Sequence, residues 1–159
     1  MQNNSYDIIF YYPQHFNRNT EGSNPLLDPL VAICKSNNLR HLIIEEPDNS
    51  TILPKNKQAI RFTFCFYTII FLRKIIPQLF FKSLQRKEQW IGNIIKIITF
   101  NKYHSKVIFT LSNSMGGFWR GYNKSAKIID YQHGIIDKNQ TGFFNKGKAP
   151  PHIYENRKE

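Results

Sequence analysis

The chain has 159 residues, which is enough for one domain with a hydrophobic core and too few for two domains of ordinary size. Its 41% hydrophobic and 14% aromatic residues exclude an intrinsically disordered protein, because disordered chains lack the apolar side chains that offset the ordering entropy. The formal net charge of +11 favours partners with anionic groups, namely a nucleotide, a nucleic acid or an anionic membrane surface.

The positive charge is concentrated in the later part of the chain. Residues 1–50 carry three Lys or Arg and six Asp or Glu, a net charge of −3, so residues 51–159 carry +14. This distribution predicts either a basic binding face or a solvated basic surface with no specific partner.

The two cysteines and the N-terminus indicate a cytoplasmic protein. Cys34 and Cys65 lie in apolar segments without CxxC spacing, so we interpret both as reduced core residues. The first ten residues lack the basic and apolar regions of a secretory signal.

The first third of the chain predicts a strand, a helix and a second strand. Residues 6–12 are an apolar and aromatic run that ends at Pro13, and residues 25–36 place apolar side chains at helical spacing after a cap at Ser23 or Asn24. Residues 39–45 form the next apolar run. A unit of this size predicts a right-handed crossover between parallel strands.

The segment 59–82 is ambiguous, because Phe62, Phe64 and Phe66 alternate as in a strand while the length favours a helix, which is our prediction. Its uninterrupted apolar part has 11 residues, from 62 to 72, whereas a membrane-spanning helix needs about 20. We therefore expect a buried or membrane-apposed helix.

The remaining elements alternate in the same way. A helix is predicted over 84–100 with an apolar stripe, a strand over 106–111, a short helix through Gly117 to Tyr122 after a cap in 112–114, and a strand over 126–131. The stripe consists of Trp90, Ile91, Ile94, Ile95 and Ile98. Four strands alternating with helices predict an α/β, Rossmann-like, doubly wound and mostly parallel sheet with helices on both faces. We place this domain at 1–145 and an irregular, incomplete continuation at 146–159.

Ligands of such sheets bind beyond the carboxyl ends of the strands, so the loops there hold the candidate residues. These are His15, Arg18, Glu21 and Gly22 after the first strand, Asn113, Ser114, Gly116 and Gly117 after the third, and Gln132, His133, Gly134 and Lys138 after the fourth.

His133 is the candidate catalytic residue. It directly follows an apolar strand and precedes a glycine, and an imidazole oriented by Asp130 or Glu21 could remove the proton from an acceptor hydroxyl as a general base. The alternative is a loop histidine that caps a strand end.

Other groups carry weaker signals. Gly116-Gly117 lacks the spacing of a phosphate-binding loop and favours a plain turn, and no histidine has paired ligand spacing, so no metal site is expected. Trp119, Arg120 and Tyr122 could stack on a sugar or a base, or could pack on the sheet as core residues.

The segment 128–135 (IIDYQHGI), together with Gly142-Phe143-Phe144, resembles the Gln-His-Gly stretch that ends the N-terminal domain of GT-B glycosyltransferases of bacterial capsule and other surface polysaccharides. A similar His-Gly element occurs in the glycerophosphotransferases that polymerise teichoic acid. The match extends to His133, Gly134 and Gln132.

The resemblance implies that this chain is the acceptor-side half of a transferase. His133 would be catalytic, and a glycan or lipid-linked acceptor would meet Gln132, Gly134, Glu21, Gly22, Asn113 and Lys138. The nucleotide-sugar donor would be held by a C-terminal domain beyond Glu159, so this half would bind no cofactor and be inactive by itself. The protein would work in the cytoplasm, at the inner face of an anionic membrane.

Two alternatives remain at this point. The region of +14 charge, with its interleaved Phe, Tyr and Trp, could be a nucleic-acid-binding module, although no signature of such a module is present. The chain could also be a membrane-associated α/β domain without catalysis.

Overall fold

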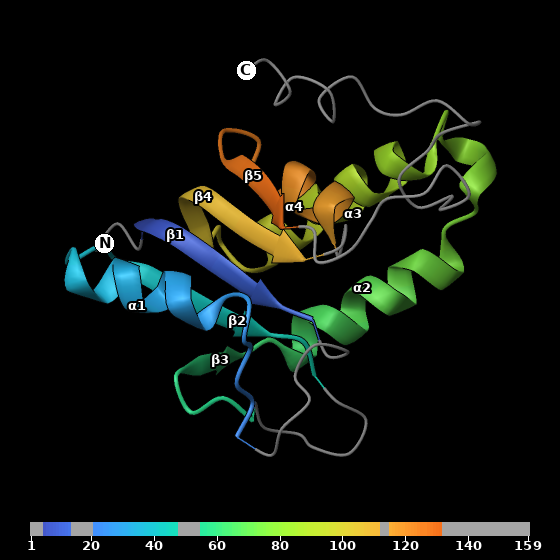
Figure 1. Cartoon of the computed structure of the whole chain (residues 1–159). Coiled ribbons are helices and arrows are strands. Elements are labelled where there is room, and N and C mark those ends of the chain that lie inside the picture. The colour runs from blue at the N-terminus through green and yellow to red at the C-terminus, as the bar shows by residue number, and fades with distance from the viewer. Residues whose placement is uncertain (1–4, 14–20, 48–54, 112–114, 132–159) are drawn as a thin grey trace, which may run out of the picture.

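The computed structural model describes residues 5–13, 21–47, 55–111 and 115–131 (Figure 1). Five strands in this part of the chain form one sheet: β1 (Ser5–Tyr12), β2 (His41–Glu45), β3 (Ala59–Arg61), β4 (His104–Leu111) and β5 (Lys127–Tyr131). The helices are α1 (Asp28–Ser36), α2 (Thr63–Ile75), α3 (Leu84–Ile98) and α4 (Gly116–Tyr122), with a 3₁₀ turn, η2 (Gln78–Phe80), between α2 and α3.

The sheet has the order β3-β2-β1-β4-β5, and each strand is parallel to its neighbours. β1 lies at the centre, where Ile8 is opposite His41 of β2 on one side and Val107 of β4 on the other. The chain first adds strands on one side of β1 and then crosses to the other side. This order confirms the predicted α/β, Rossmann-like fold.

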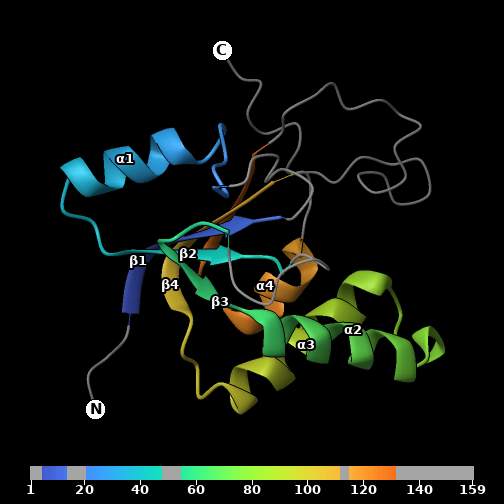
Figure 2. The ribbon, with the colours of Figure 1, turned by 90° about the horizontal axis from the view of Figure 1, so that it is seen from below.

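The alternation of side chains along β1 divides the core into two layers. Ile9 and Tyr11 belong to a cluster with the side chains of α2, α3 and α4, whereas Phe10 and Tyr12 pack with those of α1. Figure 2 shows α1 on one side of the sheet and the other three helices on the opposite side. The prediction of helices on both faces is therefore confirmed.

α1 begins at Asp28, three residues later than the sequence predicted. The Asn24 side-chain oxygen accepts hydrogen bonds from the backbone N–H groups of Leu26 and Leu27, both at 3.1 Å, so residues 25–27 form a capped turn before the helix. Pro29 lies in the first turn, as expected, and the helix ends at Ser36, with Asn37 as its C-cap.

The prediction of one helix over 59–82, and with it the count of four strands, is wrong. Residues Ala59–Arg61 are a strand at the sheet edge, with Ala59 opposite Ile43 of β2. A three-residue strand is too short to give a detectable period in the sequence. α2 then runs to Ile75, two residues before Pro77, which cannot continue a helix. No helix in the described residues is long and apolar enough to cross a membrane.

α3 and α4 pack with their backbones in contact through two glycines. A Cβ atom on Gly92 of α3 would lie 2.2 Å from the Phe118 carbonyl oxygen, and one on Gly121 of α4 would lie 1.9 Å from that of Gln89. Ile91 and Ile95 of α3 are fully buried beneath this contact.

Two members of the predicted α3 stripe lie outside the core. Trp90 and Ile98 are 43% and 44% exposed, because they flank the buried line of Ile91 and Ile95. Cys34 and Cys65 are free and buried, as predicted.

Candidate functional site

The site residues predicted from the sequence belong to the loops at the carboxyl edge of the sheet. The structure describes Glu21 and Gly22, while Gln132, His133, Gly134, Asn113 and Lys138, as well as His15, Arg18 and Ser114, lie outside the described residues. β4 ends at Leu111 and β5 ends at Tyr131. The described chain therefore reaches the carboxyl edge directly before residues 112 and 132, where these loops begin.

Gly22 joins two segments of this edge. Its φ is +68°, in the left-handed region, and a Cβ atom there would lie 2.3 Å from the backbone nitrogen of Asn56. Its carbonyl oxygen also accepts a hydrogen bond from the Asn56 side chain at 3.3 Å. The sequence predicts that Gly22 contacts a ligand. In the structure its contacts hold the segment at 22 against the segment at 55–56.

A buried carboxylate, which the sequence analysis missed, holds the same segment. Glu45 is 4% exposed, and its two oxygens accept hydrogen bonds from the backbone N–H groups of Lys55, at 3.1 Å, and Asn56, at 2.8 Å. The signal in the sequence is an acidic residue that ends an apolar strand. Glu45 thereby fixes the chain that leads into β3 against the end of β2.

A polar hollow of about 350 Å³ lies between α1 and the segment before β3. Glu21 lines it, together with Ser23, Asp28, Val31, Ala32, Lys35, Ile43, Asn56, Lys57 and Gln58. At its α1 side the Tyr12 hydroxyl donates a hydrogen bond to Asp28 at 2.6 Å. Burial and the hydrogen bond to Asp28 raise the pKa of Tyr12 well above its usual range, so this phenol stays a neutral donor.

The two carboxylates predicted to orient His133 lie on opposite faces of the sheet. Asp130 of β5 accepts a hydrogen bond from the Thr110 hydroxyl at 3.0 Å, and alternation places both side chains on the face of Ile108 and Ile128, under α3 and α4. Glu21 lines the hollow on the α1 face. The two groups therefore do not form one acidic cluster.

On the α2 side of the edge, Arg73 links three elements. Its Nε and Nη2 atoms donate to the Glu88 carboxylate at 2.8 and 2.5 Å, and Nη2 lies 3.1 Å from the Met115 sulfur. Met115 is the first described residue after β4 and has a φ of +58°. In the sequence Arg73 reads only as an interruption of an apolar segment, so its contact with the loop after β4 was missed.

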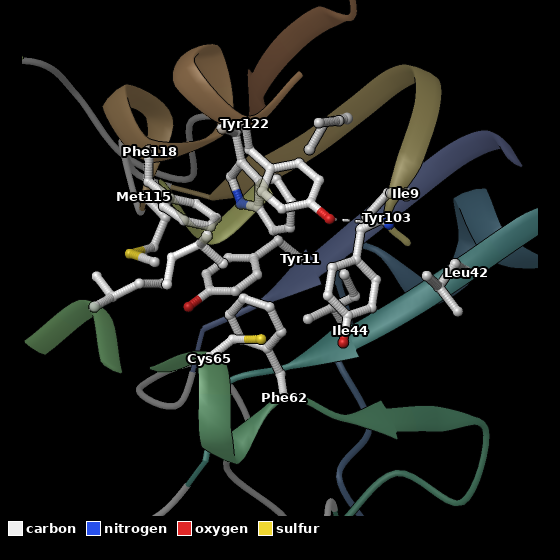
Figure 3. Packing of buried hydrophobic residues seen from close by; sticks show 14 of the residues in the cluster. Ile9, Tyr11, Leu42, Ile44, Phe62, Cys65, Tyr103, Met115, Phe118 and Tyr122 are labelled. Atoms are coloured by element: carbon white, nitrogen blue, oxygen red, sulfur yellow. Dashed lines mark hydrogen bonds between the residues drawn. The ribbon is translucent and has the colours of Figure 1, made fainter. Parts of the chain in front are cut away.

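Tyr11 lies beside this network, at the end of β1 (Figure 3). The residue is fully buried, and its hydroxyl has no hydrogen-bond partner among the described residues. Burial raises the pKa of Tyr11 well above its usual value, the nearby Glu46 raises it further, and Arg73 opposes them. Tyr11 is thus a neutral phenol within the core, beside the end of β1.

α2 connects the end of β3 with the region after β4. It starts two residues after β3, and Arg73 near its end contacts Met115, which follows β4. The ten residue steps from Thr63 to Arg73 rise about 15 Å along the helix, close to the roughly 14 Å of the three strand spacings from β3 to β4. The ends of β2 and β1 lie between these two points in the sheet order.

The aromatic residues of α4 belong to the core. Trp119 and Tyr122 are fully buried, Trp119 packs edge-on against Tyr11 with centroids 5.8 Å apart, and Gly116 begins the helix rather than a turn. These two side chains therefore do not stack on a ligand. In the described ranges no group of three His, Cys, Asp or Glu residues could hold a metal ion.

Comparison with known proteins gives no family for the chain. It matches no protein-family model, no curated protein and no solved structure.

Proposed function

We propose that the chain is the acceptor-side half of a glycosyltransferase that builds bacterial surface polysaccharide. The observation that carries the proposal is the reversal of strand order at β1, with β4 and β5 ending at the same edge immediately before Ser112 and Gln132. Open parallel sheets bind ligands at such a reversal. His133, two residues beyond β5, is the proposed general base.

The described residues supply a further group for an acceptor at this edge. The Arg73 side chain, which is 35% exposed and held by Glu88, can attract a phosphate. A lipid-linked sugar carries such a phosphate next to its sugar. In this proposal a second domain binds the nucleotide-sugar donor, so this half needs no cofactor of its own.

The alternative of a nucleic-acid-binding module has less support. Such a module needs exposed aromatic rings beside a basic groove. The rings around Phe62, Trp119 and Tyr122 are buried in the core beneath the sheet. The exposed rings of Phe64, Tyr67 and Phe71 lie along one side of a helix and do not line a groove.

Binding of an acceptor can be tested on the chain itself by nuclear magnetic resonance. An isotope-labelled chain is titrated with a short-chain prenyl-diphosphate-linked sugar, and amide shifts are followed at Tyr12, Met115 and Tyr131, with Ile33 on α1 as the remote control. The proposal expects shifts at the three edge residues and none at Ile33. Shifts confined to other regions, or none at saturating probe, contradict it.

A variant tests the contribution of Arg73. Arg73→Gln removes the charge while keeping most of the side-chain length, and we expect about a tenfold loss of affinity for the phosphorylated probe, typical of one charged hydrogen bond. The same probe without its phosphates should bind both forms equally. Equal affinity of both forms for the phosphorylated probe would remove Arg73 from the site.

A further inference from the structure

α2 is apolar on two opposite faces. Its inner face carries the buried Cys65 and Ile69, as expected for a helix packed on a sheet. Its outer face carries Phe64, Tyr67, Phe71 and Ile75, which are 71%, 50%, 58% and 54% exposed. They follow one another by three and four residues and so form one stripe. A helix covering a domain normally has a polar outer face, so this stripe needs another explanation.

The stripe continues into the turn that follows. Leu79 and Phe80 of η2 are 80% and 72% exposed, and Leu84 at the start of α3 is 64% exposed. Figures 1 and 2 both show the end of α2 and this turn projecting away from the sheet. We call these seven side chains the α2–η2 surface: Phe64, Tyr67, Phe71, Ile75, Leu79, Phe80 and Leu84. Contiguous exposed apolar side chains of this kind mark an interaction site.

Only positive charge accompanies the α2–η2 surface. Residues 59–87 contain six Lys or Arg and no Asp or Glu. Arg73 and Lys87 are held within the fold by Glu88 and by the Arg73 carbonyl oxygen. The other four, Arg61, Lys74, Lys82 and Arg86, are exposed.

We propose that the α2–η2 surface docks the protein onto an anionic lipid membrane. Aromatic and aliphatic side chains on one surface, surrounded by Lys and Arg, are the pattern of a helix that lies in the membrane interface. Tyr67 and the half-exposed Trp90 are the residue types that occupy the headgroup level.

The charge pattern distinguishes a membrane from other occupants. A second copy of this chain would bring its own cations against Lys74, Lys82 and Arg86, so like charges would repel. The surface projects as a helix and a turn, whereas single-stranded nucleic acid is held in a groove that follows its backbone. An anionic bilayer accepts both the projecting apolar side chains and the cations around them.

Docking in this orientation would bring the carboxyl edge of the sheet close to the lipid headgroups. α2 begins just after β3 and contacts Met115, which follows β4, through Arg73. The proposal of membrane docking rests on the exposed residues of the α2–η2 surface and does not depend on the proposed transferase activity.

Cosedimentation of the full chain with lipid vesicles tests the proposal. One set contains phosphatidylcholine alone, and the other contains phosphatidylcholine and phosphatidylglycerol in equal parts. We expect binding to the anionic vesicles, weakened by added salt, and at least tenfold weaker binding of the double variant L79D/F80D, because two apolar side chains no longer enter the bilayer. Replacing Lys82 and Arg86 by Gln should weaken binding about fivefold per cation.

A matched control separates this surface from general hydrophobicity. Ile33 is 56% exposed on α1, on the opposite side of the sheet, so Ile33→Asp should bind vesicles as the wild type does. Circular dichroism checks that each variant is folded. Trp90 is a built-in reporter, since its emission should shift to the blue on docking while the buried Trp119 is unaffected.

Three outcomes would overturn the proposal: no binding to anionic vesicles, binding that L79D/F80D leaves unchanged, or binding that Ile33→Asp reduces equally. If L79D/F80D instead abolishes self-association, or binding to single-stranded DNA, while vesicle binding is absent, the surface serves a second copy or a nucleic acid.

Discussion

The glycine contact between α3 and α4 predicts a reversal of an ordinary substitution effect. In an exposed helix interior, Gly→Ala stabilises a protein by about 1 kcal/mol, because alanine is the better helix former. Gly121→Ala should do the opposite here. Its Cβ atom would lie 1.9 Å from the Gln89 carbonyl oxygen, whereas ordinary contacts begin near 3.4 Å, so the two helices must separate by about 1.5 Å.

The magnitude follows from what the separation would disturb. Backbone atoms of α3 cannot move aside as the end of a side chain can, and Ile91 and Phe118 lose close packing when the helices part. Overpacking costs about 1–3 kcal/mol, and lost contacts add to it, so after the gain in helix propensity we expect a net destabilisation of about 2 kcal/mol.

Urea denaturation followed by circular dichroism measures this free energy of unfolding. Gly92→Ala should behave similarly, because its Cβ atom would meet the Phe118 carbonyl oxygen at 2.2 Å. Arg120→Ala, on the exposed side of α4, is the matched control and should change stability by less than about 0.5 kcal/mol. Gly121→Ala with unchanged or increased stability would refute the close contact of the two helices.

Three further predictions concern stability and reactivity. Phe62→Ala should lower the free energy of unfolding by about 3–5 kcal/mol in the same assay, because this fully buried ring contacts Tyr11, Tyr103, Phe118 and Trp119; a loss below about 1 kcal/mol would contradict its central position. Hydrogen bonds from Lys106 and the Arg40 backbone lower the pKa of Asp7. The contribution of Asp7 to the free energy of unfolding is therefore present above its usual pKa of 3.8 and is lost as the pH falls through its folded pKa. In an acid titration, Asp7→Asn should lose less stability than the wild type over this pH range. Burial raises the pKa of Cys65, so iodoacetamide at neutral pH should modify it far more slowly in the native than in the urea-unfolded chain; equal rates would place it at the surface.

The sheet could be predicted from the sequence because most of its strands are continuous apolar runs. Residues of β1 form a continuous apolar run, and the strand limits differ from the prediction by only one or two residues at β1, β2, β4 and β5. β3 was not predicted, since a strand of three residues is too short to show an alternation of apolar and polar residues. The exposed side of α2 could not be predicted, because a helix that is apolar on both sides gives no sign of which side faces the sheet; Phe64 and Phe71 are 71% and 58% exposed.

The candidate site was predictable only in part. The position of the loops follows from the fold class, which the order of strands confirms. The contacts of Glu45 with Lys55 and Asn56, and of Arg73 with Met115, join residues 10 to 42 positions apart in the chain. Periodicity in a single sequence contains no information on such pairs, since they depend on how the crossovers fold over the sheet.

The most direct test of the transferase proposal is the rate of sugar transfer to a lipid-linked acceptor by the chain joined to the donor domain that the proposal requires. His133→Ala is compared with His41→Ala, which changes a strand residue at the opposite end of β2 from the site. The account predicts that His133→Ala lowers turnover about a hundredfold or more with the fold intact, as expected for loss of a general base, and that His41→Ala does not. Unchanged turnover of His133→Ala would contradict the account.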